Sequence, residues 1–370
     1  MMMWGQTKVF IEKNESYSQS KKRKTLFKFF LWTVIVLLAV LLHLFVWTPS
    51  DTMHAPKLIM STDNAVANGG QISVLDLKTG TFVDLHFAAD GCDGVARNLD
   101  STKVHISCRL GKEPYVDYDV TTNSLGTNTP PFPLQPTFRS PLACTGGGKC
   151  YYGFGYAGVG GDSNGRILVT QGGELVKTID SPDRRENKFP VRFRLVDDIL
   201  WILERGESGT EAVVWRFDTL RDEFAGDPLH VGVDATDFAV TEKFVAVSVF
   251  LGALGDNVRI FDAQSGAQIR SLSLGAKGSS QSAFGIATQN NFLYVAGSNG
   301  VSAFSLETFA PILNHDTSDF AFDIAYGNHS IYVTIPNLDR IEELDPATLM
   351  LRRSFEKRVG FGYISIFEQE

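Results

Sequence analysis

One stretch, Val258-Arg-Ile-Phe-Asp262, decides the fold, because similar stretches recur as Ile72-Ser-Val-Leu-Asp76 and Ile341-Glu-Glu-Leu-Asp345. Each is a short apolar strand that ends in Asp and is followed by a turn and a further strand. In the regular units two more apolar strands precede it. Repetition of such a unit along a chain indicates a propeller or a solenoid.

The repeat can be followed through seven units by the second strand of each. The spacing between these strands suits four strands and their turns, as in a propeller blade. The second strands begin near Lys57, Val104, Tyr151, Leu200, Val245, Leu293 and Ile331. The sequence therefore predicts an all-β fold, a seven-bladed β-propeller of four-stranded antiparallel blades over residues 57–370.

The two ends of the repeat array are incomplete in complementary ways. The first unit lacks an innermost strand before Lys57, and a spare strand, residues 362–367, follows the last unit. We expect this C-terminal strand to join blade 1, which would close the ring and cover an open edge.

Two units carry a family resemblance. Phe284-Gly-Ile-Ala287, Phe292-Leu-Tyr-Val-Ala296 and Gly300-Val-Ser-Ala-Phe304 form the best match, and Phe322-Asp-Ile-Ala325 with Ile331-Tyr-Val-Thr334 is nearly as close. These stretches resemble the YVTN-type β-propeller repeat family. The resemblance implies a propeller fold and is a weak guide to activity, because propellers include both enzymes and binding modules.

A different segment precedes the repeats. Residues 29–47 contain no Asp, Glu, Lys or Arg, and as a helix they would span about 28 Å, close to the hydrocarbon core of a bilayer. Residues 1–28 are basic, which favours a cytoplasmic N-terminus. The sequence predicts a cytoplasmic tail (1–28), a transmembrane signal-anchor helix (29–47) that contacts the lipid bilayer and a linker (48–56). A cleaved signal peptide is the alternative, although its apolar region is usually shorter.

The charge of the chain is segregated between these parts. The net charge is −8, and the basic tail carries +5, so residues 29–370 carry −13. An acidic body repels phosphate backbones, which excludes nucleic acid as an expected partner.

The four cysteines suggest two hairpin disulfides. Cys92 can face Cys108, and Cys144 can face Cys150, each across the hairpin of the first two strands of a blade. A metal site is the alternative, but Cys144-x5-Cys150 has no His nearby in the sequence, so no metal is predicted. Disulfides agree with an extracytoplasmic propeller. In a eukaryotic host, Asn328 of Asn328-His-Ser330 would be a glycosylation acceptor.

Candidate ligand-binding residues come from the innermost strands. Arg192, Asp237 and Asp323 occupy one repeat position, eight residues before the aligned second-strand residue, and Asp93 lies beside the corresponding position of blade 2. We expect these charges at the mouth of the central channel, where they either bind a ligand or metal or pair with one another.

Two classes of function follow. The first is a membrane-tethered, extracytoplasmic binding or scaffolding module for a protein, peptide or glycan, with no cofactor. The second is a propeller enzyme, either a strictosidine-synthase-like or lactonase hydrolase or a quinoprotein-type dehydrogenase. Lactonase propellers usually have six blades and a channel calcium, so calcium at Asp237 and Asp323 would favour the enzyme. Whether the chain is an enzyme stays open, because no Ser/His/Asp or Cys/His arrangement falls at repeat positions.

Overall fold

The computed structural model describes residues 56–62, 71–86, 89–97, 102–111, 115–126, 141–156, 164–182, 188–206, 210–250, 256–275, 281–358 and 363–367. The predicted basic tail and transmembrane helix lie outside these residues, as does the linker up to residue 55. Within the described part of the chain, no helix has the length and apolar character needed to span a membrane.

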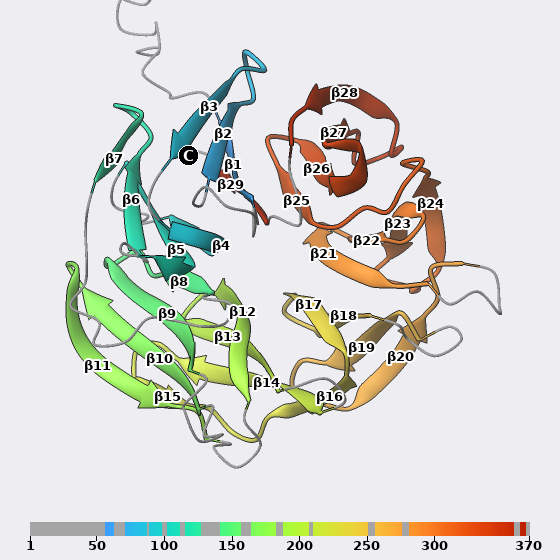
Figure 1. Ribbon diagram of the computed structural model, residues 1–370. Helices are drawn as coiled ribbons and strands as arrows, with labels where there is room; N and C mark the ends of the chain where they lie inside the picture. The colour runs from blue at the N-terminus through green and yellow to red at the C-terminus, as the bar shows by residue number, and fades with distance from the viewer. Residues whose placement is uncertain are drawn as a thin grey trace, which may run out of the picture. The chain divides into compact units, whose positions relative to one another are not determined.

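The described strands form seven antiparallel sheets arranged as the blades of a propeller, which confirms the predicted fold (Figure 1). Blades 1 to 3, each given from its innermost strand outward, are β29 (Ile364–Phe367), β1 (Lys57–Thr62), β2 (Gln71–Asp76) and β3 (Phe82–His86); β4 (Ala89–Arg97), β5 (Lys103–Gly111), β6 (Tyr115–Asp119) and β7 (Ser124–Gly126); β8 (Leu142–Cys144), β9 (Lys149–Tyr156), β10 (Asn164–Gln171) and β11 (Glu174–Asp180).

Blades 4 to 7 follow the same order. They comprise β12 (Phe189–Val196), β13 (Ile199–Arg205), β14 (Glu211–Asp218), β15 (Glu223–Phe224) and β16 (Leu229–Val233); β17 (Ala235–Val240), β18 (Phe244–Val249), β19 (Val258–Asp262) and β20 (Gln268–Leu272); β21 (Ala283–Gln289), β22 (Phe292–Gly297), β23 (Gly300–Ser305) and β24 (Pro311–His315); β25 (Ile324–Gly327), β26 (Ser330–Ile335), the 3-10 helix η2 (Pro336–Leu338), β27 (Arg340–Leu344) and β28 (Leu351–Glu356).

Blade 4 departs from four regular strands. Its outer strand is split, because β15 pairs with one end of β14 and β16 pairs with the other. The interruption falls at Gly226, which has a φ of 76°, and Pro228, which has no backbone N–H to donate.

Blade 1 combines the two ends of the propeller. β29 pairs antiparallel with β1, with Ile364 opposite Met60 and Phe367 opposite Lys57. The N-terminal strand of the ring is therefore the second strand of its blade, and the C-terminal strand is the innermost one.

The hydrophobic core is divided among the blade junctions. Seven clusters of buried apolar side chains lie one at each junction between neighbouring blades. Both faces of the second and third strands are buried, which explains why residues 244–249 and 292–297 are almost continuously apolar.

The Asp that ends the third strand caps the following turn. Asp262 Oδ1 accepts hydrogen bonds from the backbone N–H groups of Gln264 (3.2 Å) and Ser265 (2.7 Å). Asp76, Asp119 and Asp345 make the same bonds. Asp218 also does so, although Arg221 stands where the other four turns have Thr or Ser. The side-chain acceptor is therefore the essential part of this turn.

Cys144 and Cys150 form a disulfide across the β8–β9 hairpin, as predicted. Cys92 lies opposite Cys108 in the backbone register of β4 and β5. The side chain of Cys92 is outside the described residues, so the second disulfide stays a prediction. Asn328, the predicted glycosylation acceptor, lies in the turn between β25 and β26 with a φ of 47°.

Candidate functional site

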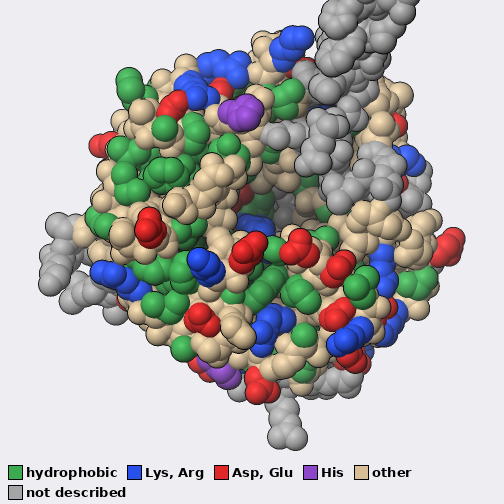
Figure 2. All heavy atoms as spheres, turned by 180° about the vertical axis from the view of Figure 1, so that it is seen from behind, with side chains coloured by type: hydrophobic (Ala, Val, Ile, Leu, Met, Phe, Trp, Pro, Cys, Tyr) green, Lys and Arg blue, Asp and Glu red, His purple; other side chains and the backbone are tan. Residues whose placement is uncertain are grey.

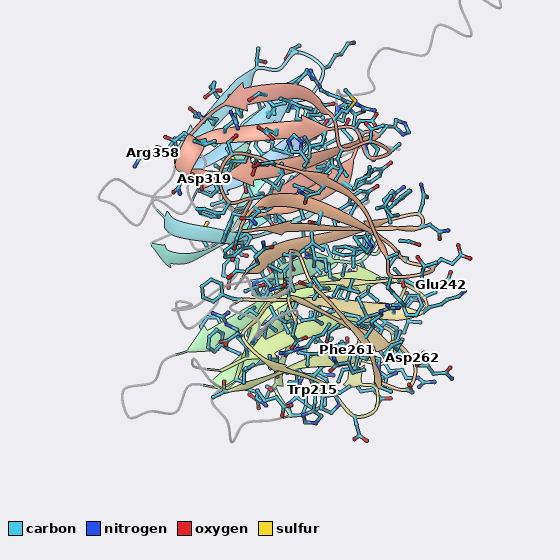
Figure 3. The ribbon with its side chains drawn as sticks, turned by 90° about the vertical axis from the view of Figure 1, so that its right-hand side faces the viewer. Trp215, Glu242, Phe261, Asp262, Asp319 and Arg358 are labelled. Atoms are coloured by element: carbon cyan, nitrogen blue, oxygen red, sulfur yellow. A yellow bond between two sulfur atoms is a disulfide. The ribbon has the colours of Figure 1, made fainter. Side chains whose placement is uncertain are left out.

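The propeller has two distinct faces. Asp319, before the innermost strand of blade 7, lies on one face, and the hairpin residues Glu242 and Asp262 lie on the other (Figure 3). We call the first the loop face, because the connections between blades reach it, and the second the hairpin face. Figure 1 views the loop face and Figure 2 the hairpin face.

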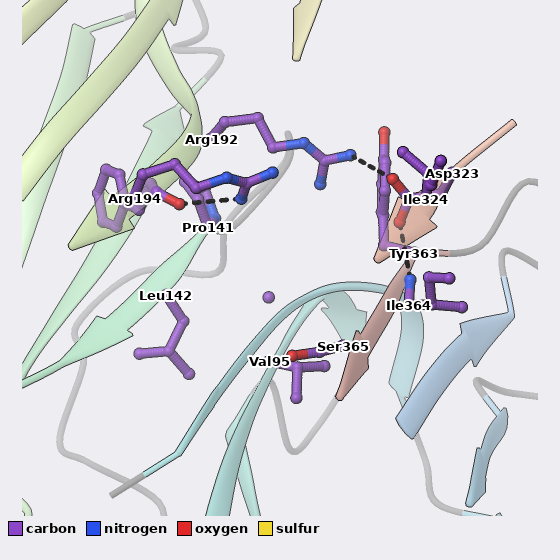
Figure 4. Close-up of a pocket in the computed structure, with 12 residues that line it drawn as sticks. Val95, Pro141, Leu142, Arg192, Arg194, Asp323, Ile324, Tyr363, Ile364 and Ser365 are labelled. Carbon is purple, nitrogen blue, oxygen red and sulfur yellow. Dashed lines mark hydrogen bonds and ion pairs between the residues drawn. The ribbon is translucent and has the colours of Figure 1, made fainter. Parts of the chain in front are cut away.

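Equivalent residues near the start of the innermost strands form what we call the axial ring. In blades 4 and 5 the ring residues pair with Leu203 and Ser248 of the second strands, and the registers of the other blades define the rest. From blade 1 to blade 7 the ring consists of Tyr363, Gly94, Pro141, Arg192, Asp237, Gly285 and Asp323. Five of the seven line a pocket of about 100 Å³ (Figure 4).

The structure brings together three of the residues predicted from the sequence. Arg192 Nε lies 3.2 Å from Asp237 Oδ1, and Arg192 Nη2 lies 3.9 Å from Asp323 Oδ1. All three are buried. The predicted charges therefore pair with one another, which was one of the two alternatives drawn from the sequence.

Two further contacts complete the surroundings of these charges. The Arg192 guanidinium carbon lies 3.4 Å from the centre of the Tyr363 ring. Arg194 Nη2 donates to both carboxylate oxygens of Asp237, at 2.9 and 3.1 Å. Asp237 thus has two cationic partners, Arg192 and Arg194, which lie two residues apart in β12.

Both carboxylates also bind the backbone of the next blade. Ile286 N–H donates to Asp237 Oδ2 (3.3 Å), and Ile364 N–H donates to Asp323 Oδ2 (2.8 Å). At these two junctions the aspartate carboxylate accepts a hydrogen bond from a backbone N–H of the neighbouring innermost strand. Burial raises the pKa of Asp323 to about 6, against the lowering effect of Arg192.

A glycine makes room for this arrangement. A Cβ on Gly285 would lie 2.9 Å from Asp323 Cα and 3.0 Å from Asp323 Oδ1. Blade 6 therefore contributes no side chain to the ring, and the carboxylate of blade 7 occupies the space.

Two residues further along the same strands, nearly every side chain is small. This second layer consists of Ser365, Ala96, Ala143, Arg194, Ala239, Ala287 and Ala325. Arg194 is the large member of the layer, and its side chain is 38% exposed. Figure 2 shows a hollow at the centre of the hairpin face, with Lys or Arg atoms in blue inside it.

An aromatic arc on the loop side was not predicted. Phe284 packs against Phe250, Phe320 and Phe322 with ring centroids 5.6–5.8 Å apart, and Phe322 lies 5.7 Å from Tyr363. We call these five rings the aromatic arc. It crosses blades 5, 6, 7 and 1 and ends on Arg192 through Tyr363. Phe250 is 40% exposed, and Phe284, Phe320 and Phe322 are half-buried.

Several members of the ring, and Phe284 of the arc, lie beside β-bulges, which the alternation of residues along a strand does not reveal. The pairing of first and second strands slips between Pro190 and Arg192, between Ala235 and Asp237, and between Ala283 and Ile286. β4 slips at Asp93 in the same way. A bulge re-aims the side chains beside it. The side chain of Asp93 lies outside the described residues, so its predicted role is not tested.

No family model matches the chain, and no curated protein sequence matches it. The resemblance to the YVTN-type repeat therefore stays a prediction. Similarity to solved structures is found at the level of the fold.

A protein from Lactobacillus plantarum is 14% identical with a TM-score of 0.62, over 85% of this chain and 100% of its own. A Bacteroides fragilis protein provisionally named 6-phosphogluconolactonase is 14% identical with a TM-score of 0.61, over 86% of this chain and 100% of its own. The dihydro-heme d1 dehydrogenase NirN is 14% identical with a TM-score of 0.54, over 82% of this chain and 63% of its own. At such low identity these similarities show the propeller fold alone.

Proposed function

We propose that the propeller is a binding module that takes a protein or peptide ligand at the loop-face mouth of its channel. The aromatic arc carries this proposal. Aromatic residues and arginine are enriched at protein interfaces, and Tyr and Arg are among the residues that contribute most of the binding energy there. Phe250 at 40% exposed supplies accessible apolar surface, and the arc continues inward to Arg192.

The charged ring supports binding over catalysis. A general acid or base needs a proton-transfer atom within reach of a substrate. Asp237 accepts hydrogen bonds from Arg194 and from the backbone N–H of Ile286. Asp323 pairs with Arg192 and accepts a hydrogen bond from the backbone N–H of Ile364. The carboxylates are therefore used to hold blades together, and the arc is left as the surface for a ligand.

One observation favours the enzyme alternative. Asp323 has a pKa raised to about 6 and lines the pocket, and a carboxyl that exchanges a proton near neutral pH is suited to acid–base chemistry. Similar propellers include a protein named as a phosphogluconolactonase and a dehydrogenase. A lactone hydrolase is accordingly our second candidate.

We further propose that residues 29–47 tether the module to a membrane and that the propeller lies outside the cytosol. The uncharged segment and its basic flank support the tether, and the Cys144–Cys150 disulfide supports the compartment. Lys57, at the start of β1, bonds to Val120 O and Asn123 Oδ1 in a hairpin-face turn of blade 2. The described chain therefore enters the ring on the hairpin face, and the aromatic arc lies on the loop face.

Site-directed photo-crosslinking in the source cells tests the binding proposal. A photoreactive residue at Phe250 should give a discrete adduct, and the additional change Phe284→Ala should reduce it. The matched control is the same photoreactive residue at Leu220, which is 75% exposed in a hairpin-face turn. Equal adducts at both positions, or none at Phe250, would count against the loop-face site.

The enzyme candidate is tested separately on the purified full chain. Hydrolysis of 6-phosphoglucono-δ-lactone above the spontaneous rate, lost in a folded Asp323→Asn variant, would replace the binding proposal. A spontaneous rate with both proteins would remove the lactonase candidate.

A further inference from the structure

The junction between blades 2 and 3 assembles three metal-binding side chains around a disulfide. His105 comes from β5, and Cys144 and Cys150 come from the β8–β9 hairpin. One ligand atom from each residue lies within 4.8 Å of the other two. The sequence offered no histidine near Cys144-x5-Cys150, and the fold supplies one from the preceding blade.

The histidine already has the carboxylate partner that metal-ligating histidines commonly have. His105 Nδ1 lies 2.6 Å from Asp117 Oδ1, and the Asp117 side chain is 8% exposed. With Nδ1 held by this carboxylate, Nε2 is the nitrogen left for a metal. Ligating histidines commonly use their other ring nitrogen in this way, which fixes the tautomer and the ring orientation.

The surroundings are enclosed and apolar. Cys144 is 6% exposed and Cys150 is 2% exposed, within a core cluster that includes Tyr115 and Tyr152. His105 is partly exposed, at 13% of its side chain, so an ion has a route to the cluster. Two thiolates and one imidazole around an enclosed position form a donor set suited to Zn²⁺ and other soft or borderline ions.

We propose that reduction of the Cys144–Cys150 disulfide opens a Cys₂His metal site made by Cys144, Cys150 and His105. A dithiol reductant supplies two electrons and two protons; the protein disulfide becomes two thiols, and the dithiol becomes a disulfide. A divalent ion then displaces the two thiol protons and takes two S⁻ ligands and the neutral imidazole. Three protein ligands leave one coordination position for water or another ligand.

The required movement is small. In a tetrahedral zinc site, ligand atoms lie roughly 3.3–3.8 Å apart, given metal–ligand distances of about 2.0–2.3 Å. The three atoms here already lie within 4.8 Å of one another. A change of side-chain rotamers, with the two sulfurs moving apart, is enough to form the site.

Co²⁺ and Zn²⁺ titrations of the reduced full chain test the proposal. The experiment uses a Cys92→Ser/Cys108→Ser background, so that Cys144 and Cys150 are the remaining cysteines. We expect thiolate-to-Co²⁺ charge-transfer absorption at one ion per chain, reversed by Zn²⁺. The change His105→Ala should weaken binding by more than about tenfold, and Asp117→Asn by about tenfold with the same thiolate absorption.

Several results would overturn the proposal. Metal binding unchanged by His105→Ala would show that the two thiolates alone bind the ion. Loss of the aromatic near-ultraviolet circular dichroism on reduction would show that the fold around the site depends on the disulfide. Where the double-serine background fails to fold, the reduced wild-type chain is compared with its Cys144→Ser/Cys150→Ser variant, which must lose one bound ion. The outcome is independent of the loop-face ligand.

Discussion

Arg192, in blade 4, contacts residues of three other blades. Its guanidinium contacts Asp237 of blade 5, Asp323 of blade 7 and the Tyr363 ring of blade 1. A buried cation is costly to leave unpaired, and two carboxylates and an aromatic face offset that cost here. Arg192 is therefore a structural centre of the ring.

The pH dependence of stability should report Asp323. Its pKa in the folded protein is raised from 3.8 to about 6, so the folded state keeps this proton after the unfolded chain has lost it. The contribution of Asp323 to stability therefore falls as pH rises from about 4 to about 6, by at most about 3 kcal/mol. In Asp323→Asn this fall should be absent. Urea unfolding of both proteins between pH 4 and pH 8 measures the difference.

A carboxylate of opposite behaviour serves as the control. A hydrogen bond from the Thr121 side chain, with others from backbone N–H groups, lowers the pKa of Asp119. The cost of Asp119→Asn should therefore be largest at neutral pH and shrink as pH falls. If the cost of Asp323→Asn also became smaller as pH falls, the raised pKa of Asp323 would be contradicted.

Gly285 is a second residue of the axial ring whose identity is constrained, because its neighbours leave no room for a side chain. The change Gly285→Ala places a Cβ 2.9 Å from the backbone of Asp323 and Ile324, where neither atom can move cheaply. We expect a loss of about 1–3 kcal/mol in the free energy of unfolding. Gly147→Ala is the matched control, because no atom lies within 4 Å of its Cβ position and its effect should stay within about 0.5 kcal/mol. Chemical denaturation compares the two variants, and equal costs would refute the steric argument.

Among the elements, the short strand β29 contributes to the sheet of blade 1, to the core and to the axial ring. Its pairing with β1 completes blade 1, Ile364 joins the core cluster between blades 7 and 1, and Ile364 N–H bonds to Asp323. The residue before it, Tyr363, carries the stacking with Arg192. This short strand thus closes the sheet and the axial ring together.

Deletion of residues 361–370 should destabilise the entire propeller. The deletion exposes the edge of β1, removes the buried Ile364 side chain and leaves the Asp323 carboxylate without its N–H partner. We expect a loss of at least about 3 kcal/mol and a lower melting temperature. The control is deletion of residues 368–370 alone, which leaves β29 whole. Calorimetry of both truncations decides, and unchanged melting of the longer truncation would refute closure by β29.

Elements and site differ in how far the sequence could predict them. Apolar strands and the Asp262 and Asp345 turns were predictable, because buried strands and side-chain-capped turns depend on local residue types. The bulges at Val191 and Thr236 were not, since an extra residue in a strand leaves no compositional mark. Arg192, Asp237 and Asp323 were found by counting along the repeat.

At the scale of the whole molecule, contacts between blades that are distant in sequence decide the site. The aromatic arc needs Phe250 to meet Phe284 and Tyr363 to meet Phe322, and His105 meets Cys144 across a blade junction. No local pattern predicts such meetings. They follow from the twist and packing angle of each blade, which set the residues that face one another around the channel.

The axial ring should also couple the stabilities of blades on opposite sides of the channel. Arg192 and Asp323 belong to blades 4 and 7, and two whole blades separate them along the ring. Both are buried, so a double-mutant cycle of Arg192→Met and Asp323→Asn should give an interaction energy of about 1–3 kcal/mol. The control cycle, Arg166→Met with Asp180→Asn, concerns a pair within blade 3 whose side chains are 42% and 36% exposed. That pair should give less than about 1 kcal/mol, because water screens it. Equal interaction energies in the two cycles, measured by urea unfolding, would mean that the axial charges do not join opposite sides of the ring.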